Sequence, residues 1–375
     1  MPGLFDTDVF VVGGGPAGLA AAIAARQQGF RVMVADCALP PIDKACGEGL
    51  MPDSLNVLRR LGLHLGPADG GSFRGIKFIG PKDAVAASFP SGLGVGVRRV
   101  LLHDMLIRHA EALGVETLWR ARVSFPDKQT LTVNGSRIRS RWVVGADGQN
   151  SWTREWARLS QGRVRNQRIA MRRHFRVHRW SEYVEIYWGD DAQAYITPVG
   201  ADTICVALIS RKRMTSFEHG LSAFPRLAER LAGATPESDM RGALSLSRRL
   251  RQVWRDNVAL VGEASGSVDA ITGEGLALSF RQALALAPAL AAGDLSAYAA
   301  AHRRVSRLPE FMARSMLLLD SSSVLRRRTL RALTQQPELF EQMLAVHVGE
   351  LSLKDFAARG LFDFGRQLLA AQRRS

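Results

Sequence analysis

The sequence predicts an α/β fold: a parallel sheet with helices, interrupted along the chain by an antiparallel-sheet domain and followed by a helical C-terminal region. Short apolar runs that end in glycine recur at Gly13, Gly145 and Gly262. Helical patterns follow the first and the last of them, whereas residues of about 166–250 tend to alternate instead. With 375 residues, 46% of them hydrophobic, the chain is long enough to bury a full core.

The first unit has the order strand, glycine turn, helix, strand. An apolar run at 8–12 precedes Gly13, an alanine-rich helical pattern covers about 16–28, and a second apolar run covers 30–36. The helical pattern stops at Gly29, a residue suited to the C-terminal turn of a helix. This order is typical of the βαβ unit of a parallel sheet. The other elements expected in this style are a helix at 99–113, strands at 142–145 and 257–261, and a helix at 275–290.

The middle of the chain has a different pattern. Strands are expected at 183–188, 194–199 and 203–209, separated by turns that contain glycine and aspartate. Consecutive strands joined by such short turns form an antiparallel meander. We therefore expect this part to form a separate layer or domain.

The last stretch, roughly 296–375, has an amphipathic helical pattern that Pro309 and Pro337 are expected to break. The chain is thus expected to form three parts. The expected boundaries are 1–75 with 96–165 and 255–300 for the discontinuous parallel-sheet domain, 76–95 with 166–254 for the antiparallel domain, and 301–375 for the helical region.

Gly13–Gly18 has the spacing GxGxxG, between a predicted strand and a predicted helix. In such a turn the first glycine allows the tight bend, Gly15 lets a pyrophosphate approach the backbone, and Gly18 lets helix and strand pack closely. Ala17 lies at the helix N-terminus, whose free N–H groups attract the anion. Asp36 ends the second strand, where its carboxylate can accept hydrogen bonds from a ribose. These features predict a Rossmann-type dinucleotide site. They do not decide whether the dinucleotide is FAD or NAD.

Two later segments, at 145–148 and 262–275, favour FAD. The ribityl chain of FAD needs a hydrogen-bonding carboxylate, and its isoalloxazine ring gains from a positive dipole where reduction places negative charge. A helix that begins at Gly275 supplies this dipole from its backbone, and glycine permits close approach of the ring. The candidate contacts in these segments are Asp147, Gly148, Gly262, Glu263, Gly273 and Gly275.

The three segments resemble the signatures of the para-hydroxybenzoate hydroxylase-like flavoproteins. Residues 44–49 and the Thr-Gly-Glu-Gly sequence look more like the geranylgeranyl reductase branch of that superfamily. The segment 97–102 is similar to the family segment whose arginine contacts the flavin, and Arg99 aligns best with that arginine. The resemblance covers roughly 6–160 and 255–300 and implies an FAD-dependent oxidoreductase.

The chain departs from this pattern at two places. The family usually has aspartate where Glu263 stands, and glutamate is one methylene longer. The reductases carry an aromatic-rich strand of which only Tyr195 and Pro198 match here. The resemblance therefore implies the cofactor more specifically than the substrate.

The resemblance also implies the reaction cycle. NAD(P)H, docking without a Rossmann domain of its own, reduces the flavin. The flavin then either reduces or monooxygenates a hydrophobic small molecule, namely an isoprenoid, a polyketide or an aromatic compound. The sequence leaves this choice open.

Two alternatives stay open. Gly47–Pro52 resembles a segment of the flavin-dependent halogenases, which also need a WxWxIP-like stretch, absent here, and a reactive lysine, for which Lys77 is the candidate. The other alternative is a non-catalytic flavin-binding module of a larger assembly, docked through the basic C-terminal helices.

Cys46 matches a cysteine that lies near the isoalloxazine in the reductase branch, which implies a catalytic or positioning role; the alternative is a small packing residue. Glu48 is either a proton donor or a hydrogen-bond partner of its own turn.

His174 and His178 lie on a predicted strand, where four residues span about 13 Å, so they cannot share an ion. We expect no metal site.

The net charge of +15 comes mainly from arginine, since only 6 of the 50 basic residues are lysine. Because the arginine clusters are short and scattered, we expect solvated surface charge and no nucleic-acid binding. Contact with an anionic membrane surface or an acidic carrier protein is the alternative.

Three cysteines without a CxxC spacing argue against a disulfide framework, and the N-terminus lacks a signal-peptide pattern. We therefore expect a cytoplasmic location, with peripheral membrane contact as the variant.

Overall fold

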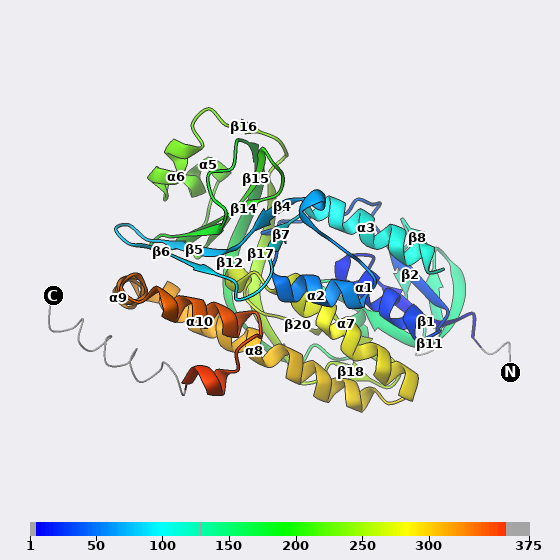
Figure 1. The fold of residues 1–375 in the computed structure, drawn as a ribbon. Helices are drawn as coiled ribbons and strands as arrows, with labels where there is room; N and C mark the ends of the chain where they lie inside the picture. Colours follow the sequence, from blue (N-terminus) through cyan, green and yellow to red (C-terminus); the bar gives the residue numbers. More distant parts are fainter. Residues whose placement is uncertain (1–4, 128–129, 358–375) are drawn as a thin grey trace.

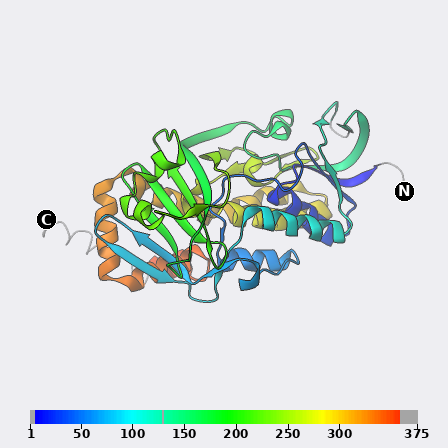
Figure 2. The ribbon, with the colours of Figure 1, turned by 90° about the horizontal axis from the view of Figure 1, so that it is seen from above.

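The structure is a computed structural model that describes residues 5–127 and 130–357. In these residues the strands form three sheets, which helices flank (Figure 1). The parallel sheet and the antiparallel sheet lie at opposite ends of an elongated molecule (Figure 2). The predicted α/β fold with an inserted antiparallel sheet is confirmed.

The mainly parallel sheet consists of β1 (Thr7–Val12), β2 (Val32–Asp36), β8 (Glu116–Trp119), β9 (Val123–Ser124), β10 (Thr130–Val133), β11 (Ser136–Gly145), β18 (Trp254–Arg255) and β19 (Val258–Leu260). Its order is β18-β19-β11-β1-β2-β8. The five strands from β19 to β8 are parallel, whereas β18, β10 and β9 are added antiparallel. The glycine-ended strands β1, β11 and β19 are therefore neighbours in space.

Three helices build the core beside this sheet: α1 (Pro16–Gln27), α3 (Arg99–Ala112) and α7 (Gly275–Ala292). The alanines of α1 after Ala17 are buried, and α7 packs against α1 because small side chains let two helices approach closely. Within the described residues, α7 is the one helix long and apolar enough to cross a membrane, but 56% of it is buried as a core helix. Its apolar sequence is explained by this burial.

The second sheet consists of β5 (Gly75–Ile79), β6 (Ala84–Ser88), β12 (Gly162–Arg176), β13 (Val184–Trp188), β14 (Ala192–Pro198), β15 (Thr203–Ser210), β16 (Thr235–Pro236), β17 (Arg241–Leu250) and β20 (Gly266–Ser267). Its order is β20-β17-β12-β15-β14-β13-β5-β6, and β16 pairs with β12. All pairs are antiparallel except β13 with β5. The strand β5 of this parallel pair comes from an earlier part of the chain than β13.

Shorter elements complete the fold. They are the strands β3 (Gly49–Leu50), β4 (Gly71–Phe73) and β7 (Gly94–Gly96), which form the third sheet, the helices α2 (Pro52–Arg60), α4 (Trp152–Trp156), α5 (Phe217–Leu221) and α6 (Pro225–Arg230), and the 3-10 turns η1 (Pro67–Asp69), η2 (Gly262–Ser265) and η3 (Ala270–Thr272). The third sheet lies beside the segment that carries Cys46 and Glu48, since β3 begins directly after it.

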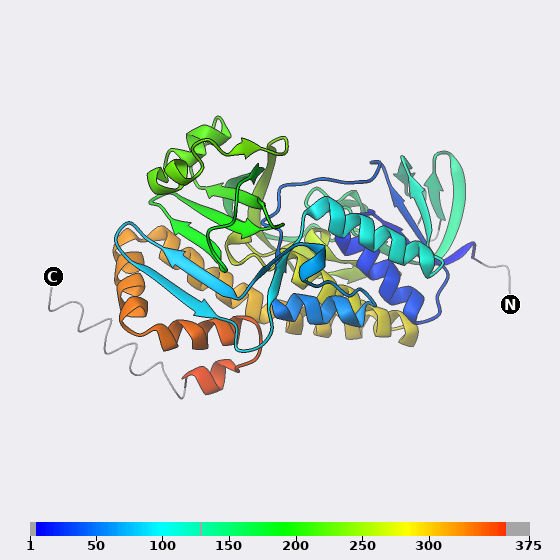
Figure 3. The same ribbon diagram turned by 45° about the horizontal axis from the view of Figure 1, so that its top comes forward.

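The C-terminal part forms α8 (Leu295–Ser321), α9 (Ser323–Gln335) and α10 (Pro337–His347). The break expected at Pro337 is confirmed, because this residue begins α10. The break expected at Pro309 is wrong: α8 continues through it, and through the expected boundary at 300/301. Pro309 is buried, so packing compensates for the missing backbone hydrogen bond. α9 and α10 pack against β6 (Figure 3).

Candidate active site

Three stretches that are distant in sequence meet at the carboxyl ends of β1, β11 and β19. A Cβ on Gly13 would stand 2.4 Å from the carbonyl oxygen of Ala146, and one on Gly262 would stand 2.6 Å from the Cβ of Ala17. Such close approach requires glycine, which also has a positive φ at both positions. The three segments that open at Gly13, Gly145 and Gly262 are therefore in contact with one another.

A buried arginine ties two of these stretches together. The guanidinium of Arg154 donates to the carbonyl of Gln149 at 2.9 Å and to that of Ala264 at 3.2 Å. Sequence reasoning missed the role of Arg154, because one of its two partners, Ala264, lies 110 residues away. Gly148 is also close to Glu263, whose Oε2 would lie 3.9 Å from a Cβ at position 148.

One large cavity, of about 1110 Å³, opens where these stretches meet. On one side it is lined by predicted contact residues, namely Gly13, Gly15, Ala17, Asp36, Cys46, Arg99, Asp147, Gly148, Glu263, Gly273 and Gly275. Gly18 and Gly262 are not in the lining; they support it by close packing. The opposite wall is apolar and belongs largely to the antiparallel sheet, with Val184, Ile186, Tyr195, Ala207, Ile209 and Leu246.

Asp36 and a histidine hold the first glycine turn. Oδ2 of Asp36 accepts from the Gly14 N–H at 2.7 Å. His103, on α3, accepts from the Ile42 N–H through Nδ1 at 3.2 Å, so its Nε2–H donates to the Gly14 carbonyl at 2.7 Å. Burial lowers the pKa of His103, which keeps the ring neutral in this role. Sequence reasoning missed His103, since its spacing from the turn carries no local signal.

Asp147 is engaged with the helix that follows it. Its carboxylate accepts from the Ser151 hydroxyl at 2.5 Å and from the Thr153 N–H at 2.9 Å, so it caps the start of α4. The residue lines the cavity as predicted, yet part of its hydrogen-bonding capacity orders the turn. The backbone around Gly148 is thereby fixed.

Glu263 forms an ion pair with Lys44, whose Nζ lies 2.5 Å from Oε2. Both residues line the cavity and are about two-fifths exposed. The carboxylate at position 263 thus reaches the segment that carries Lys44. The pair joins η2 to that segment across the cavity mouth.

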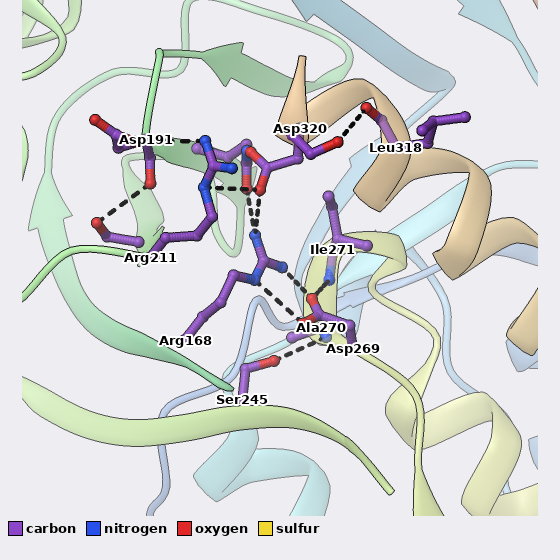
Figure 4. A network of polar contacts seen from close by, with 12 residues as sticks. Arg168, Asp191, Arg211, Ser245, Asp269, Ala270, Ile271, Leu318 and Asp320 are labelled. Atoms are coloured by element: carbon purple, nitrogen blue, oxygen red, sulfur yellow. Dashed lines mark hydrogen bonds and ion pairs between the residues drawn. The ribbon is translucent and has the colours of Figure 1, made fainter. Parts of the chain in front are cut away.

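The segment that leads to Gly273 and Gly275 is anchored by a buried ionic network. Figure 4 shows the Arg168 guanidinium pointing at Asp269 on one side and at Asp320 on the other. Its Nε lies 3.1 Å from Oδ2 of Asp269, and its NH1 lies 3.8 Å from Oδ2 of Asp320. Asp269 caps η3 by accepting from the Ile271 N–H at 3.0 Å. The network therefore connects β12, η3 and α8.

The expectation that the arginines lie on a solvated surface is wrong for several of them. Arg168 and Arg172 on β12 and Arg326 on α9 have side chains no more than 5% exposed, and each has a carboxylate partner. Buried charges require such partners, which sequence clustering does not reveal.

Glu48 lies in a second buried cluster at the cavity wall. Its Oε1 accepts from the Arg99 N–H at 2.9 Å, and its Oε2 lies 2.6 Å from Nε2 of His174. Potential ligand atoms of Glu48, His174 and Cys205 lie within 4.8 Å of one another. The Arg172 guanidinium is 3.2 Å from Nδ1 of His174 and 3.9 Å from Glu48, and this fixed positive charge disfavours a metal cation.

His178 has a separate environment. The strand β12 ends at Arg176, and His178 lies beyond it, 85% exposed and 3.0 Å from Asp202. The sequence pattern suggests a comparison of His174 with His178, but it carries no signal for the contact of His174 with Glu48, 126 residues away.

The family comparison agrees with this geometry. The profile of the FAD binding domain family matches residues 6–296, well over half of the chain. The chain belongs to the FAD binding domain family. The FAD-binding prediction made from the glycine segments is thereby confirmed at the level of the family.

Two relatives of this family member are reductases. Menaquinone reductase of Mycobacterium tuberculosis is 37% identical over 158 residues, which cover 39% of this chain and 38% of that protein. Digeranylgeranylglycerophospholipid reductase of Thermoplasma acidophilum is 26% identical over 298 residues, covering 72% of this chain and 74% of that protein. The match therefore spans less than half of the length of the menaquinone reductase.

A solved structure has the same fold. The flavin-dependent brominase Bmp2 superposes with a TM-score of 0.77 at 21% sequence identity, covering 98% of this chain and 100% of that one. At this identity the likeness concerns the fold alone. Lys77, the candidate for a halogenase lysine, lies 3.5 Å from Glu185 in an ion pair and is not in the cavity lining.

The cavity of this FAD binding domain fits the cofactor that the family implies. A Cβ on Gly15 or Gly275 would meet no protein atom within 4 Å, so neither packing nor a positive φ requires glycine at these two positions. The buried Nε of Arg99 has no hydrogen-bond partner. Open backbone and an unpaired guanidinium N–H suit an anionic nucleotide that needs close approach.

Burial raises the pKa of the Cys46 thiol above its usual range, which disfavours the thiolate. Since the thiolate is the reactive form, we expect iodoacetamide at neutral pH to modify the exposed Cys37 first and Cys46 only slowly. Labelling of Cys46 should accelerate as the pH rises. Peptide mass spectrometry measures this, and labelling of Cys46 as fast as that of Cys37 at neutral pH would contradict it.

Glu274, between the two cavity glycines, is expected to destabilise the fold at neutral pH. Its side chain is fully buried, and neither carboxylate oxygen has a hydrogen-bond partner. Burial raises its pKa above the usual range and outweighs Arg281 and His347, each 3.8 Å away, which favour the charged form. Because the pKa of Glu274 is higher in the folded than in the unfolded chain, its contribution to the free energy of unfolding is present at low pH and is lost as the pH rises through the folded-state pKa. Glu274→Gln should therefore raise the free energy of unfolding at neutral pH and leave it little changed in acid. Urea unfolding at both pH values tests this, and a less stable variant at neutral pH would refute it.

Proposed function

We propose that the protein is an FAD-dependent oxidoreductase that takes reducing equivalents from NAD(P)H and reduces a carbon–carbon double bond of a hydrophobic, isoprenoid-type molecule. The observation that carries this proposal is the single cavity, with glycine backbone on one side and an apolar sheet face on the other. Its volume of about 1110 Å³ is at the upper end for a ligand pocket, which leaves room for a substrate beside a dinucleotide.

The chain's own residues have distinct tasks in this proposal. The backbone around Gly15 and the start of α1 bind the pyrophosphate, and Arg99 offers its unpaired N–H to the cofactor. FAD, when bound, supplies hydride and electron transfer. The apolar wall that includes Ile186 and Tyr195 orients the substrate and excludes water.

The substrate class is supported by two relatives as well as by the wall. Menaquinone reductase and digeranylgeranylglycerophospholipid reductase are both named for lipids that carry isoprenoid chains. Such chains are apolar and unsaturated, which suits a wall of aliphatic side chains. We further propose a cytoplasmic location, with the substrate drawn from a membrane surface.

The test separates the two half-reactions in a stopped-flow instrument. The FAD-loaded protein is reduced with NADH or NADPH without oxygen, and is then mixed with a menaquinone bearing an unsaturated side chain or with buffer containing oxygen. Reoxidation by the polyprenyl compound supports reduction. A C4a-oxygen adduct absorbing in the near ultraviolet, with no anaerobic reoxidation, would instead identify a monooxygenase.

A further inference from the structure

The contacts of Glu48 connect the cavity with the molecular surface. Glu48 lines the cavity, whereas its partner His174 is buried behind it. On the far side, Nδ1 of His174 lies 2.8 Å from the hydroxyl of Ser238, which is partly exposed after β16. A continuous row of hydrogen bonds therefore runs from the cavity through Glu48, His174 and Ser238 to solvent.

The neighbours of His174 define which nitrogen carries its proton. The Arg172 guanidinium, which can only donate, lies 3.2 Å from Nδ1, so Nδ1 is an acceptor in the neutral ring. Nε2 then carries the hydrogen and donates to Oε2 of Glu48 at 2.6 Å. The Ser238 hydroxyl accepts from the His174 backbone N–H at 3.1 Å, and its own hydrogen can go either to the Asp239 carbonyl at 3.2 Å or to Nδ1 of His174 at 2.8 Å. In both contacts, Ser238 with His174 and His174 with Glu48, the group nearer the solvent can donate and the group nearer the cavity can accept.

The backbone at Glu48 is strained to hold this position. Its φ of 61° is in the left-handed region, which costs roughly 1–3 kcal/mol for a residue other than glycine. Its flanking residues Gly47 and Gly49 show that the turn accepts glycine. A carboxylate at a position better suited to glycine indicates that the side chain is needed.

Other charged and ionisable groups surround the pair of Glu48 and His174. The Arg172 guanidinium contributes a fixed positive charge beside Glu48, and burial raises the pKa of both the Cys46 and the Cys205 thiols, which disfavours their thiolate forms. Asp43 neutralises Arg172 on the side away from the cavity. Glu48 and His174 are thus the groups of this cluster that can pass a proton onward.

We propose that Glu48, His174 and Ser238 form a proton relay that delivers a solvent proton to the cavity, with Glu48 as the donor to the bound substrate. The proposal rests on the proposed function. When a hydride adds to one carbon of a double bond, the electron pair of the π bond remains on the other carbon, which must take a proton. His174 passes its Nε2 proton to Glu48, and Glu48 gives it to that carbon. Ser238 then donates a proton to Nδ1 of His174 and regains its own from water, so the only further reactant is a solvent proton.

Infrared difference spectroscopy tests the relay without any substrate. Light-driven reduction of bound FAD places negative charge in the cavity, and the relay responds by moving a proton onto Glu48. We expect a new carbonyl band of a protonated carboxyl group, shifted in heavy water and absent in Glu48→Gln. His174→Gln should weaken the band, whereas the matched control His178→Gln, an exposed histidine four residues away, should keep it.

Turnover gives the second measurement. Glu48→Gln should bind FAD and accept hydride from NAD(P)H like the wild type, while reoxidation by the unsaturated menaquinone slows by about 10²–10⁴-fold. An unaltered infrared band in Glu48→Gln would overturn the relay, as would a zinc ion retained by the wild type and lost in His174→Gln. If Glu48→Gln fails to fold, the His174→Gln band decides. Failure of wild-type reoxidation by the polyprenyl compound counts against the proposed function alone, because the infrared band needs no substrate.

Discussion

Gly15→Val is expected to fold normally and to lose FAD. Gly15 has φ −72° and ψ 177°, which valine adopts without strain, and its Cβ would meet no protein atom within 4 Å. The added side chain would instead occupy the space through which the pyrophosphate approaches the start of α1. The flavin absorbance of the purified variant, together with its thermal unfolding, measures both parts of the expectation.

Gly66→Val is the matched control. This glycine also has an extended backbone and open space at its Cβ, but it does not line the cavity. We expect it to retain FAD at the wild-type ratio. A Gly15→Val protein that holds as much FAD as this control would show that the nucleotide does not bind at the first glycine turn.

Arg168→Ala is expected to lower the free energy of unfolding by about 3–5 kcal/mol. The reason is that Asp269 and Asp320, both no more than 2% exposed, would lose a shared cationic partner. Because Asp269 caps η3, the segment before Gly273 should also loosen and FAD should bind more weakly. Urea unfolding and a titration with FAD measure the two effects.

Arg249→Ala, on the neighbouring strand β17, is the control for Arg168→Ala. Its ion pair with Glu310 is 3.9 Å long and its side chain is 68% exposed, so solvent screens the interaction. We expect little change in stability. Adding Asp269→Asn to Arg168→Ala should recover part of the loss, since it removes a buried charge; equal stability of the Arg168→Ala and Arg249→Ala proteins would refute the anchoring role.

The sequence predicted those features that depend on neighbouring residues. The glycine turn at Gly13–Gly18, the strand before it and the helix after it follow from local sterics and periodicity, and the structure has them at these positions. The sequence also indicated the two later glycine segments, because short apolar runs lead to Gly145 and Gly262, although the strand that ends at Gly145 begins as early as Ser136.

The features that the sequence did not predict depend on contacts between distant residues. His103 meets Gly14 across 89 positions, and Arg168 meets Asp269 across 101. Neither pair has a spacing that marks it in one sequence. Pro309 was misjudged for a similar reason, since a proline usually ends a helix unless burial of that helix compensates. Burial is a property of the folded chain.

The account depends on the convergence of three glycine segments on one flavin nucleotide, and calorimetric titration of the purified, flavin-stripped protein tests it most directly. FAD should bind with one-to-one stoichiometry to the wild type and to Gly66→Val, and should give no binding heat with Gly15→Val. NAD⁺ should not compete with FAD for the site. A folded wild-type protein that gives no heat with FAD, or binds NAD⁺ in its place, would contradict the account.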